Sequence, residues 1–531
     1  MDGRPVERLN FQRNGFVSRL PIHRPGPSLA LLTSALLLLG VVVPAASAQT
    51  GDWSLPVPLS NETASSWFPD ITVDLGGEVH VAWSSGVALG SGQAYDTVVY
   101  VSTPDGLAWS APLDIVALPS KGAVTRPMLL SDPAGMLHMT YRSYMIFYTH
   151  ATTQAVSAPA LLPARPISSG DNGYFSQLAL DAAGRLHVFY TEYSQRVDCP
   201  ECLHVYHRVS DDSGLTWSRP IDITPGPSGA AKPRVLIDGR GSLHLVWEAG
   251  RGGDLGQLGD PATAMYTASD DGGQTWRGPI QMAPDEGQAR NVALGLTGNG
   301  QLVAAWLGLP EDQLVYRTSD NGGRTWAEPQ PIPAAFGGWT VYQGRTDGYS
   351  MVTDGAGVVH LLAVGRTSAL QTSLSLLHLT WDGAAWSTPE TVVTLIGDVP
   401  EWPRAAVGLG NQLHVVWFVR DQAHIWGGEG AFRYRVWYAN RPLDVPAQTP
   451  VVFPTLTPAS PAAVGPTASA PPQDPTPTAS AGAPPLSSFA PADAIPPADV
   501  ENRSVLLILQ AMMPVGLLLG GIVLVVYLRR R

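Results

Sequence analysis

The chain has 531 residues and a formal net charge of -12, with 44% hydrophobic and only 14% charged residues. This composition excludes a globally disordered chain, and the acidic balance argues against a general nucleic-acid binder. Two cysteines are too few for a disulfide-stapled scaffold or a multi-cysteine metal array. The length exceeds what one small domain needs, and 55 glycines with 48 prolines indicate many turns and a linker.

The N-terminal residues 1–48 are typical of a secretory signal peptide. An arginine-containing start is followed by an apolar run over 29–43 and by small residues at Ala46 and Ala48. Cleavage after Ala48 would leave Gln49 as the first residue, and an uncleaved membrane anchor is the alternative. Both versions predict that the rest of the chain is exported.

One sequence unit recurs seven times within residues 49–445, at intervals of 49–59 residues. Its spine is an apolar strand (strand A), a turn based on Asp-x-x-Gly, and a second strand (strand B) that carries a histidine and ends on an aromatic residue in most copies. The copies are 74–83, 132–141, 181–190, 238–247, 297–306, 354–363 and 408–417. Alternating apolar positions around a tight turn predict antiparallel hairpins, and the long period predicts an array or a propeller.

A second motif, Ser-x-Asp-x-Gly-x-Thr-Trp, lies between copies of the first, where it would join a third strand (C) to a fourth (D). It is well formed at 210–217, 269–276 and 319–326, where Asn321 replaces the aspartate, and degenerate at 102–109 and 380–386. The aspartate can accept hydrogen bonds from the backbone of its own turn, and the glycine takes a left-handed conformation. Asp212 and Asp271 are therefore predicted to form turns rather than to act in catalysis.

These motifs resemble the Asp boxes of the sialidase-like, BNR-repeat β-propeller superfamily, and the resemblance covers residues 49–445. It implies an all-β fold in which each blade is a four-stranded antiparallel sheet. The segment that begins at Trp53 looks like a D strand without a blade of its own, and the last repeat lacks a D strand. We therefore predict seven blades closed by the N-terminal strand, with a six-bladed ring of the sialidase type as the alternative.

The histidines and tryptophans of the repeats are predicted to be structural, because they recur once per blade. Six histidines share one position of the B strand: His80, His138, His187, His244, His360 and His414. Ten of the 16 tryptophans also occupy repeated positions, either on B strands or at the start of D strands. A catalytic or metal-binding residue should instead be singular or locally clustered.

The two cysteines, Cys199 and Cys202, lie in the loop between the B and C strands of the third repeat. In an exported protein the favoured interpretation is a local disulfide, with a redox pair, a metal ligand or a free thiol as alternatives. Two thiolates alone do not make a zinc site, so no metal is expected. No glycine-rich phosphate loop precedes a helix, so no nucleotide cofactor is expected either.

A candidate ligand site is predicted where the D-to-A connections and the B–C loops share one face of the ring. Arginines gather near the A strands there, and the predicted ligand-binding set is Arg126, Arg234, Arg290, Arg345 and Arg404. Guanidinium groups suit carboxylate, sulfate or phosphate. The alternative is that an arginine-rich composition placed these side chains on loops without a ligand, since the chain has only two lysines.

The resemblance also implies what a catalytic member would need, namely three arginines for the sugar carboxylate, a tyrosine nucleophile relayed by a glutamate, and an aspartate acid/base. Matching segments give the catalytic candidates Tyr349, Asp347 and Glu192. The family's Arg-Ile-Pro signature is missing, because residues 67–70 read Trp-Phe-Pro-Asp. We therefore favour a non-catalytic propeller that binds glycans or protein partners, and the alternative is an exo-sialidase-like hydrolase of acidic sugars.

The C-terminal part is predicted to tether the propeller to a membrane. Residues 446–504 are rich in proline, alanine, threonine and serine, and are expected to be a disordered spacer. The apolar run 505–528 is long enough for a transmembrane helix, and the arginines 529–531 should stay on the cytoplasmic side. The expected product is a monomeric, single-pass protein of the cell membrane, with its propeller on the extracytoplasmic side.

Overall fold

A computed structural model describes residues 52–61, 64–88, 94–117, 124–153, 164–170, 173–194, 202–250, 262–284, 288–338, 348–395, 398–421 and 434–453. The predicted signal peptide and the apolar run 505–528 lie outside these residues, as does the spacer from 454 onward. None of the residues in the described ranges forms a helix that is long and apolar enough to cross a membrane.

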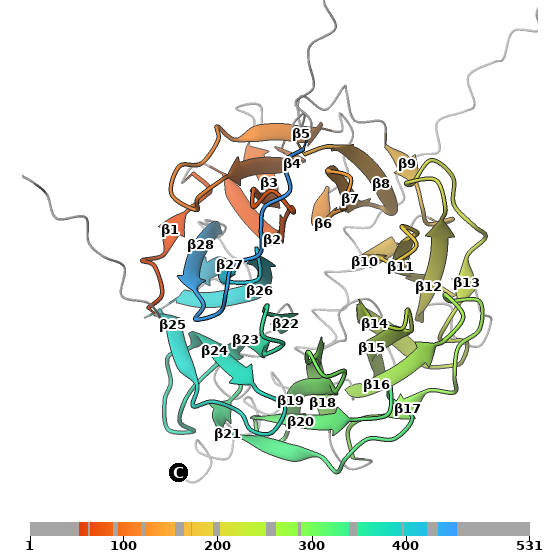
Figure 1. The fold of residues 1–531 in the computed structure, drawn as a ribbon, viewed down its shortest axis with the longest axis vertical. Coiled ribbons are helices and arrows are strands. Elements are labelled where there is room, and N and C mark those ends of the chain that lie inside the picture. Colours follow the sequence, from red (N-terminus) through yellow and green to blue (C-terminus); the bar gives the residue numbers. More distant parts are fainter. Residues whose placement is uncertain are drawn as a thin grey trace, which may run out of the picture. The chain divides into compact units, whose positions relative to one another are not determined.

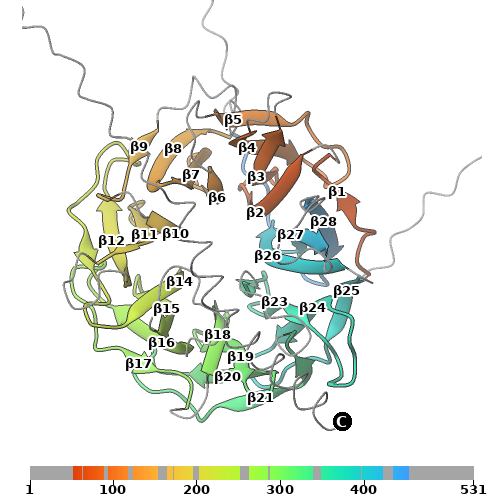
Figure 2. The ribbon, with the colours of Figure 1, turned by 180° about the vertical axis from the view of Figure 1, so that it is seen from behind.

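The described chain forms seven four-stranded antiparallel sheets arranged as a ring (Figure 1), and the same ring is seen from behind in Figure 2. Blade 1 has β2 (Ser65–Val73), β3 (Val79–Ala88), β4 (Ala94–Thr103) and β5 (Leu113–Ala117). Blade 2 has β6 (Thr125–Ser131), β7 (Met136–Ser143), β8 (Met145–Thr152) and β9 (Arg165–Pro166). Blade 3 has β10 (Gly173–Leu180), β11 (Leu186–Tyr193), β12 (Leu203–Ser210) and β13 (Ile221–Asp222).

The remaining blades follow the same order, with strand A on the inside of the ring and strand D on the outside (Figure 1). Blade 4 has β14 (Gly229–Ile237), β15 (Leu243–Gly250), β16 (Ala262–Ser269) and β17 (Ile280–Gln281). Blade 5 has β18 (Gln288–Leu296), β19 (Leu302–Leu309), β20 (Gln313–Ser319) and β21 (Gln330–Phe336). Blade 6 has β22 (Ser350–Thr353), β23 (Val359–Gly365), β24 (Ser375–Trp381) and β25 (Glu390–Thr394).

Blade 7 joins the two ends of the described chain. Its three inner strands are β26 (Asp398–Gly408), β27 (Gln412–Asp421) and β28 (Arg435–Pro442), and its outer strand is β1 (Val57–Pro58) from the N-terminus. Val57 pairs with Tyr438, and the backbone bond from Ser54 N to Asn440 O measures 2.8 Å. The predicted all-β, seven-bladed ring and its N-terminal closing strand are confirmed, and the six-bladed alternative is wrong. Closure covers the sheet edge that β28 would otherwise expose.

The segment that follows β28 also packs on the ring, across the A–B turns of blades 7 and 1. Gln448 N donates to Leu409 O at 2.7 Å, and Val451 N donates to Leu75 O at 2.8 Å. The ring of Phe453 then lies against Gly135, in the A–B turn of blade 2. The first residues of the predicted spacer, 446–453, thus brace the junction between the first and last blades (Figure 1).

The repeated tryptophans and histidines form the interfaces between blades. Each tryptophan that opens a D strand meets, nearly edge-on, the ring of a tyrosine or histidine on strand C of the preceding blade. Ring centroids are 4.8–6.0 Å apart in the pairs Trp109–Tyr438, Trp217–Tyr148, Trp276–His207, Trp326–Tyr266, Trp386–Tyr316 and Trp53–His378. Edge-on aromatic pairs of this kind are favourable beyond their burial, so the tryptophans hold the blades together.

The B-strand histidines each contact a ring on strand C of their own blade, and five of these six rings also meet a tryptophan. Nδ1 of His80, His138, His244 and His414 lies 2.7 Å from the hydroxyl of a tyrosine on strand C. In His187 and His360, the partner is a second histidine, at 2.9–3.0 Å. In blade 5, Val303 stands at the histidine position and Thr297 at the position of the turn aspartate. Blade 7 keeps His414 although Gly408 replaces the turn aspartate there, so the contact from the histidine to strand C does not require the aspartate.

Candidate functional site

A bulge interrupts strand A near its start in six of the seven blades. The pairing register with strand B shifts between Trp67 and Asp70 in blade 1, and at the equivalent place in blades 2, 3, 4, 5 and 7. In five of these bulges the first residue is left-handed although it is not glycine, with φ of 51–57° at Phe68, Arg126, Lys232, Asn291 and Trp402. Such conformations are costly and gather at functional sites, so the bulge positions mark the channel as a candidate site.

Bulky bulge residues fill the channel on the side of blades 7, 1, 2 and 3. The ring of Phe68 lies 5.1 Å from Trp402, edge-on. The guanidinium of Arg126 lies 4.7 Å from the Phe68 ring and 4.8 Å from the Phe175 ring. Arg126 is thus buried between two aromatic rings, an arrangement in which its charge is stabilised by the ring faces.

Blade 6 differs from the other blades because glycine, Gly348, stands at the bulge position. A Cβ atom placed on Gly348 would lie 2.9 Å from Nη2 of Arg234, 3.3 Å from Nη1 of Arg404 and 3.5 Å from the Trp402 ring. Gly348 does not have a left-handed backbone, so its φ does not require glycine. The missing side chain instead allows the two guanidinium groups to lie against the backbone of Gly348.

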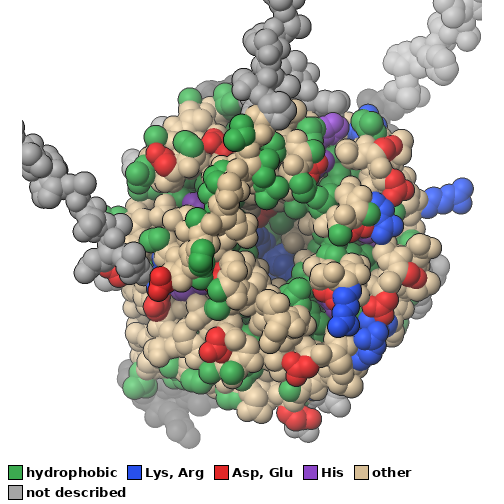
Figure 3. Space-filling view, viewed as in Figure 1, with side chains coloured by type: hydrophobic (Ala, Val, Ile, Leu, Met, Phe, Trp, Pro, Cys, Tyr) green, Lys and Arg blue, Asp and Glu red, His purple; other side chains and the backbone are tan. Residues whose placement is uncertain are grey.

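Arg234 and Arg404 occupy the same position of strand A, two residues after the start of the bulge. Both guanidiniums lie over Trp402, at 5.7 Å and 4.1 Å from its ring. Arg404 is 5% exposed, whereas Arg234 is partly exposed, and Figure 3 shows Lys and Arg side chains at the bottom of a hollow in the middle of the ring. We call Arg234, Arg404, Asp70, Trp402 and Gly348 the central cluster.

Both arginines have N–H groups that the described residues do not satisfy. Arg404 donates Nη1 to Pro403 O at 2.9 Å, while its buried Nη2 has no hydrogen-bond partner among the described residues. Arg234 donates Nη1 to Pro233 O at 3.4 Å and makes no other hydrogen bond within the described ranges. Burial lowers the pKa of Arg234 to about 10 and that of Arg404 well below its usual value. A buried cation with unsatisfied donors is costly unless an anion joins it.

Asp70 is the carboxylate of the central cluster. Its Oδ1 lies 3.6 Å from Nε of Arg404, and its Oδ2 accepts a hydrogen bond from Leu129 N at 2.6 Å. Burial raises the pKa of Asp70 to about 6, although Arg404, the backbone donors and Arg234 act in the opposite direction. A single carboxylate is therefore the counter-charge of two guanidiniums.

Two further pairs of opposite charges lie near the bulges. Nζ of Lys232 lies 3.1 Å from Glu248 Oε1, which also accepts a hydrogen bond from Asn291 N at 2.7 Å. The fully buried Glu401 contacts Arg420, and burial raises its pKa well above the usual value. These pairs leave the central cluster with two cations and one carboxylate.

The five arginines predicted to bind a ligand fall into separate groups. Arg234 and Arg404 come together in the central cluster, and Arg126 lies next to it between two aromatic rings. Arg290 is 3% exposed and sits before the bulge of blade 5, at a different strand position. Arg345 lies outside the described residues.

Two of the three catalytic candidates lie among the described residues, and both are buried. Tyr349 is 1% exposed and packs in an apolar cluster between blades 5 and 6. Glu192 is 4% exposed and accepts hydrogen bonds from the backbone and the hydroxyl of Ser169, at 3.2 and 3.1 Å. Asp347 lies outside the described residues.

Two further predictions concern sulfur and metal. Cys202 is buried and its sulfur is in a disulfide, but Cys199 lies outside the described residues, so this pairing stays a prediction. Within the described ranges there is no group of three or more His, Cys, Asp or Glu that could hold a metal ion.

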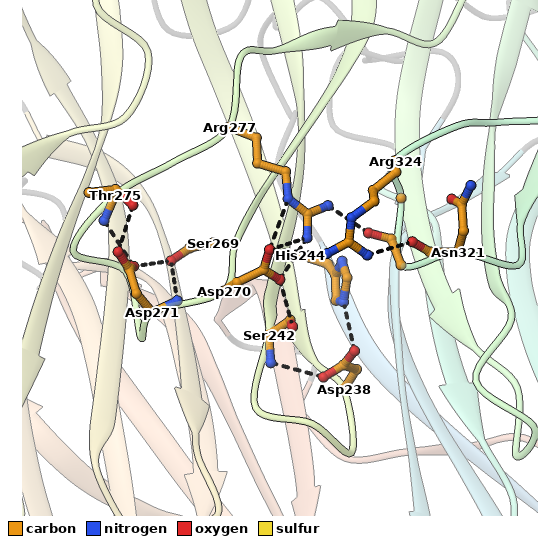
Figure 4. A network of polar contacts seen from close by, with 12 residues as sticks. Asp238, Ser242, His244, Ser269, Asp270, Asp271, Thr275, Arg277, Asn321 and Arg324 are labelled. Carbon is orange, nitrogen blue, oxygen red and sulfur yellow. Dashed lines mark hydrogen bonds and ion pairs between the residues drawn. The ribbon is translucent and has the colours of Figure 1, made fainter.

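The Asp boxes form turns, as predicted. Asp271 accepts hydrogen bonds from the backbone and the hydroxyl of Thr275, at 2.9 and 2.6 Å, and from Ser269 (Figure 4). These donors lower the pKa of Asp271 to about 2. An aspartate with such a pKa stays ionised at neutral pH, and it is unsuited to donate a proton. In blade 4, Asp270 links the box to the A–B turn through Ser242, at 2.9 Å (Figure 4).

The glycine of an Asp box sits directly under the aromatic interface, which gives a stability prediction. Gly214 has φ of +84°, and a Cβ there would lie 2.1 Å from the hydroxyl of the buried Tyr148. We expect Gly214→Ala to lower the free energy of unfolding by about 2–4 kcal/mol, through left-handed strain and overpacking. Gly184→Ala is the control, because Gly184 has φ of +79° and nothing within 4 Å. Equal losses in denaturant unfolding would contradict the predicted clash.

The sequence did not point to Asp70, Gly348 or Trp402 as site residues. A usable signal was nevertheless present, because a residue followed by proline recurs at the bulges of blades 1, 2, 4 and 7, at 68–69, 126–127, 232–233 and 402–403. Aligning the chain on these pairs places Asp70, Arg234 and Arg404 at one repeat position and Gly348 at the bulge position of blade 6.

The ring, its four-stranded blades and its Asp boxes define a seven-bladed Asp-box propeller. Residues 152–395 match the family described as a BNR repeat-like domain. This match confirms the predicted resemblance to the BNR-repeat propeller superfamily. No curated protein matches the sequence.

Solved structures with a similar fold cover most of the chain at low sequence identity. A protein of unknown function from Dyadobacter fermentans DSM 18053 is 17% identical, with 74% of this chain and 99% of that chain covered and a TM-score of 0.44. An ulvan lyase, described as a new family of polysaccharide lyase, is 10% identical, with 71% and 94% covered and a TM-score of 0.47. The NanB sialidase of Streptococcus pneumoniae is 11% identical, with 73% and 70% covered and a TM-score of 0.42.

Proposed function

We propose that this protein is a non-catalytic propeller that binds an acidic glycan through the central cluster. The observation that carries the proposal is the convergence of Arg234 and Arg404 on Gly348, with N–H donors that the described residues leave unsatisfied. A carboxylate or sulfate group offers the oxygen acceptors that guanidinium forks bind best.

The charge balance supports an anion rather than a neutral sugar or a cation. Lys232 is paired with Glu248, and Arg420 with Glu401. Among the described carboxylates, Asp70 is the one at ion-pair distance from an arginine of the cluster, and Glu248 also favours the charged form of Arg234. An acidic group bound there would neutralise the remaining positive charge of the cluster and accept hydrogen bonds from the guanidinium N–H groups.

The placement of the catalytic candidates favours binding over hydrolysis. A nucleophile must reach the anomeric carbon of a bound sugar, and Tyr349 is almost fully buried among apolar side chains. Glu192 is held by Ser169, and the first A strand has Trp67, Phe68 and Pro69 where an arginine signature would stand in a sialidase.

The predicted export signal and C-terminal anchor remain part of the proposal. With 1–48 directing export and 505–528 spanning the membrane, the propeller would be displayed on the extracytoplasmic side at the end of a proline-rich spacer. A glycan-binding ring in that place could hold extracellular or cell-wall polymers, and a surface protein that presents acidic groups is the partner alternative.

A binding panel tests the proposal directly. The purified full-length chain, in detergent, is titrated with oligosaccharides that carry carboxylates, with oligosaccharides that carry sulfates, and with their neutral counterparts. We expect affinity for at least one acidic class and none for the neutral counterparts. Binding of neutral glycans alone would overturn the proposal, and so would the absence of any binding.

An activity measurement on the same preparation tests the hydrolase alternative. We expect no release of fluorophore from a fluorogenic sialoside under conditions where the acidic glycan binds. Turnover that Tyr349→Phe abolishes, without loss of folding, would show that the tyrosine is exposed during catalysis and would replace binding by hydrolysis as the function.

A further inference from the structure

The carboxylate of Asp70 lies where a ligand of the central cluster would be expected to place its own negative charge. Oδ1 of Asp70 faces Nε of Arg404 at 3.6 Å, which is ion-pair distance but too long for a hydrogen bond. Oδ2 is held on the other side by Leu129 N. Asp70 thus neutralises the arginines in part and leaves their N–H donors open.

The strands that pack around Asp70 contribute few other charges that act on it. From β26 and β14 these are Arg404 and Arg234, which both favour the ionised carboxylate. On β6, the side chain of Arg126 is turned between the rings of Phe68 and Phe175. The proton affinity of Asp70 therefore depends mainly on burial and on the two arginines of the cluster.

The remaining charges on these strands are already engaged elsewhere. Glu401 on β26 contacts Arg420 on β27, and Lys232 on β14 is paired with Glu248 on β15. On β3, His80 is directed to Tyr100 and to Asp74 in the A–B turn. An anion arriving at Arg234 and Arg404 would therefore meet the carboxylate of Asp70, which is already at ion-pair distance from Arg404.

We infer that Asp70 is the internal counter-ion of the central cluster, and that an anion bound by Arg234 and Arg404 is taken up together with one proton on Asp70. This inference rests on the proposed function and adds its regulation. The proton removes the like charge that a bound carboxylate or sulfate would face at close range, where the surrounding protein screens poorly. Burial already raises the pKa of Asp70 to about 6, so protonation needs only a modest further shift.

Linkage gives the inference a measurable form. If binding requires protonated Asp70, affinity must rise as the pH falls toward 6, by up to about tenfold for each pH unit above that value. Acidic surroundings would then strengthen capture, and neutral to alkaline surroundings would release the anion.

The probe is N-acetylglucosamine 6-sulfate, whose charge is constant over this range, with N-acetylglucosamine as the neutral control. Affinity of the full-length chain is measured by calorimetry at several values between pH 6 and 8, in buffers of different ionisation enthalpy. We expect tighter binding at pH 6 and uptake of close to one proton for each anion bound at pH 8. Binding of constant affinity with no proton uptake would overturn the inference while leaving the proposed function intact. Absence of binding at every pH would count against the proposed function itself.

Asp70→Asn tests the residue assignment. We expect this variant to bind the probe at pH 8 as tightly as the original chain binds it at pH 6, and to lose the pH dependence. Asp114→Asn, at an exposed position of β5, is the matched control and should keep the original profile. A pH dependence that survives in Asp70→Asn would overturn the assignment. If that variant fails to fold, the proton uptake of the original chain tests the inference instead.

Gly348 gives a second test of the same site, because both guanidiniums lie against it. Gly348→Ala places a methyl group against both guanidiniums, and we expect weaker binding at every pH with the pH dependence retained. Gly278→Ala is the control, because nothing lies within 4 Å of its Cβ position. Unchanged affinity in Gly348→Ala would place the anion away from these two guanidiniums and overturn the inference.

Discussion

Arg234→Gln is expected to weaken the binding of an acidic glycan by roughly 10- to 100-fold, because hydrogen bonds to a charged group contribute about 1.5–3 kcal/mol. Arg234 is the informative arginine because it is partly exposed and makes only one long hydrogen bond, to Pro233 O, among the described residues. Its removal should therefore affect binding far more than folding. Calorimetric titration of the full-length chain measures the change.

The control for this substitution is Arg240→Gln. Arg240 is an exposed arginine in the A–B turn of the same blade, so the variant makes the same change in net charge outside the hollow. We expect its affinity to stay within about twofold of the original. An equal loss in both variants would mean that the net charge of the surface, rather than the central cluster, attracts the anion.

The second large effect concerns acid stability, which the buried histidines are expected to control. Burial lowers the pKa of His414 from 6.5 to about 4. Because the folded-state pKa is below the unfolded value, the unfolded chain binds more protons between pH 6.5 and 4, and stability falls across that window. At about 1.4 kcal/mol for each pKa unit, His414 alone lowers the free energy of unfolding by about 3 kcal/mol.

Other interface histidines act in the same direction. Burial lowers the pKa of His207 to about 3 and that of His360 to about 4, and both belong to stacked histidine pairs between strands B and C. The chain should therefore lose most of its stability between pH 6.5 and 4, before the turn aspartates are protonated. Denaturant unfolding at a series of pH values measures this loss.

His414→Val isolates one of these contributions. Blade 5 already has Val303 at this repeat position, so valine fits the environment. Between pH 7 and pH 4, we expect the free energy of unfolding of the variant to fall by about 3 kcal/mol less than that of the original chain. Tyr438→Phe, which removes the 2.7 Å contact to His414 but keeps the histidine, should leave the pH dependence nearly unchanged. An unaltered pH profile in His414→Val would contradict the assignment.

The blades could be predicted from the sequence because each one is built from local signals. The Asp-x-x-Gly turns and the Asp boxes each define a hairpin within about ten residues. The segment at Trp53 resembles a D strand but has no A, B or C strand before it, which predicted that it closes the last blade. Recurrence at one position also identified the histidines as structural, since a unique chemical site would not repeat in six blades.

The central cluster could be predicted only in part. Arg234 and Arg404 were among the candidates, but their convergence depends on the bulge that turns each strand A toward the channel. Arg290 looked equivalent in the sequence. It lies before the bulge of blade 5, however, whereas Arg234 and Arg404 lie after the bulges of blades 4 and 7. In the sequence, Asp70 was noticed only because the arginine signature expected in its segment was missing. Its partners, Arg234 and Arg404, come from blades 4 and 7, far along the chain, so no local pattern linked them to it.

The central claim is that an anion binds between Arg234 and Arg404, and its location is the most direct test. Crystals of the full-length protein or of its complex with selenate can be measured at the selenium absorption edge. We predict an anomalous peak within hydrogen-bond distance of both guanidiniums, beside Gly348 and above Trp402. Selenate bound only at the outer surface, with the central hollow containing water alone, would contradict the account.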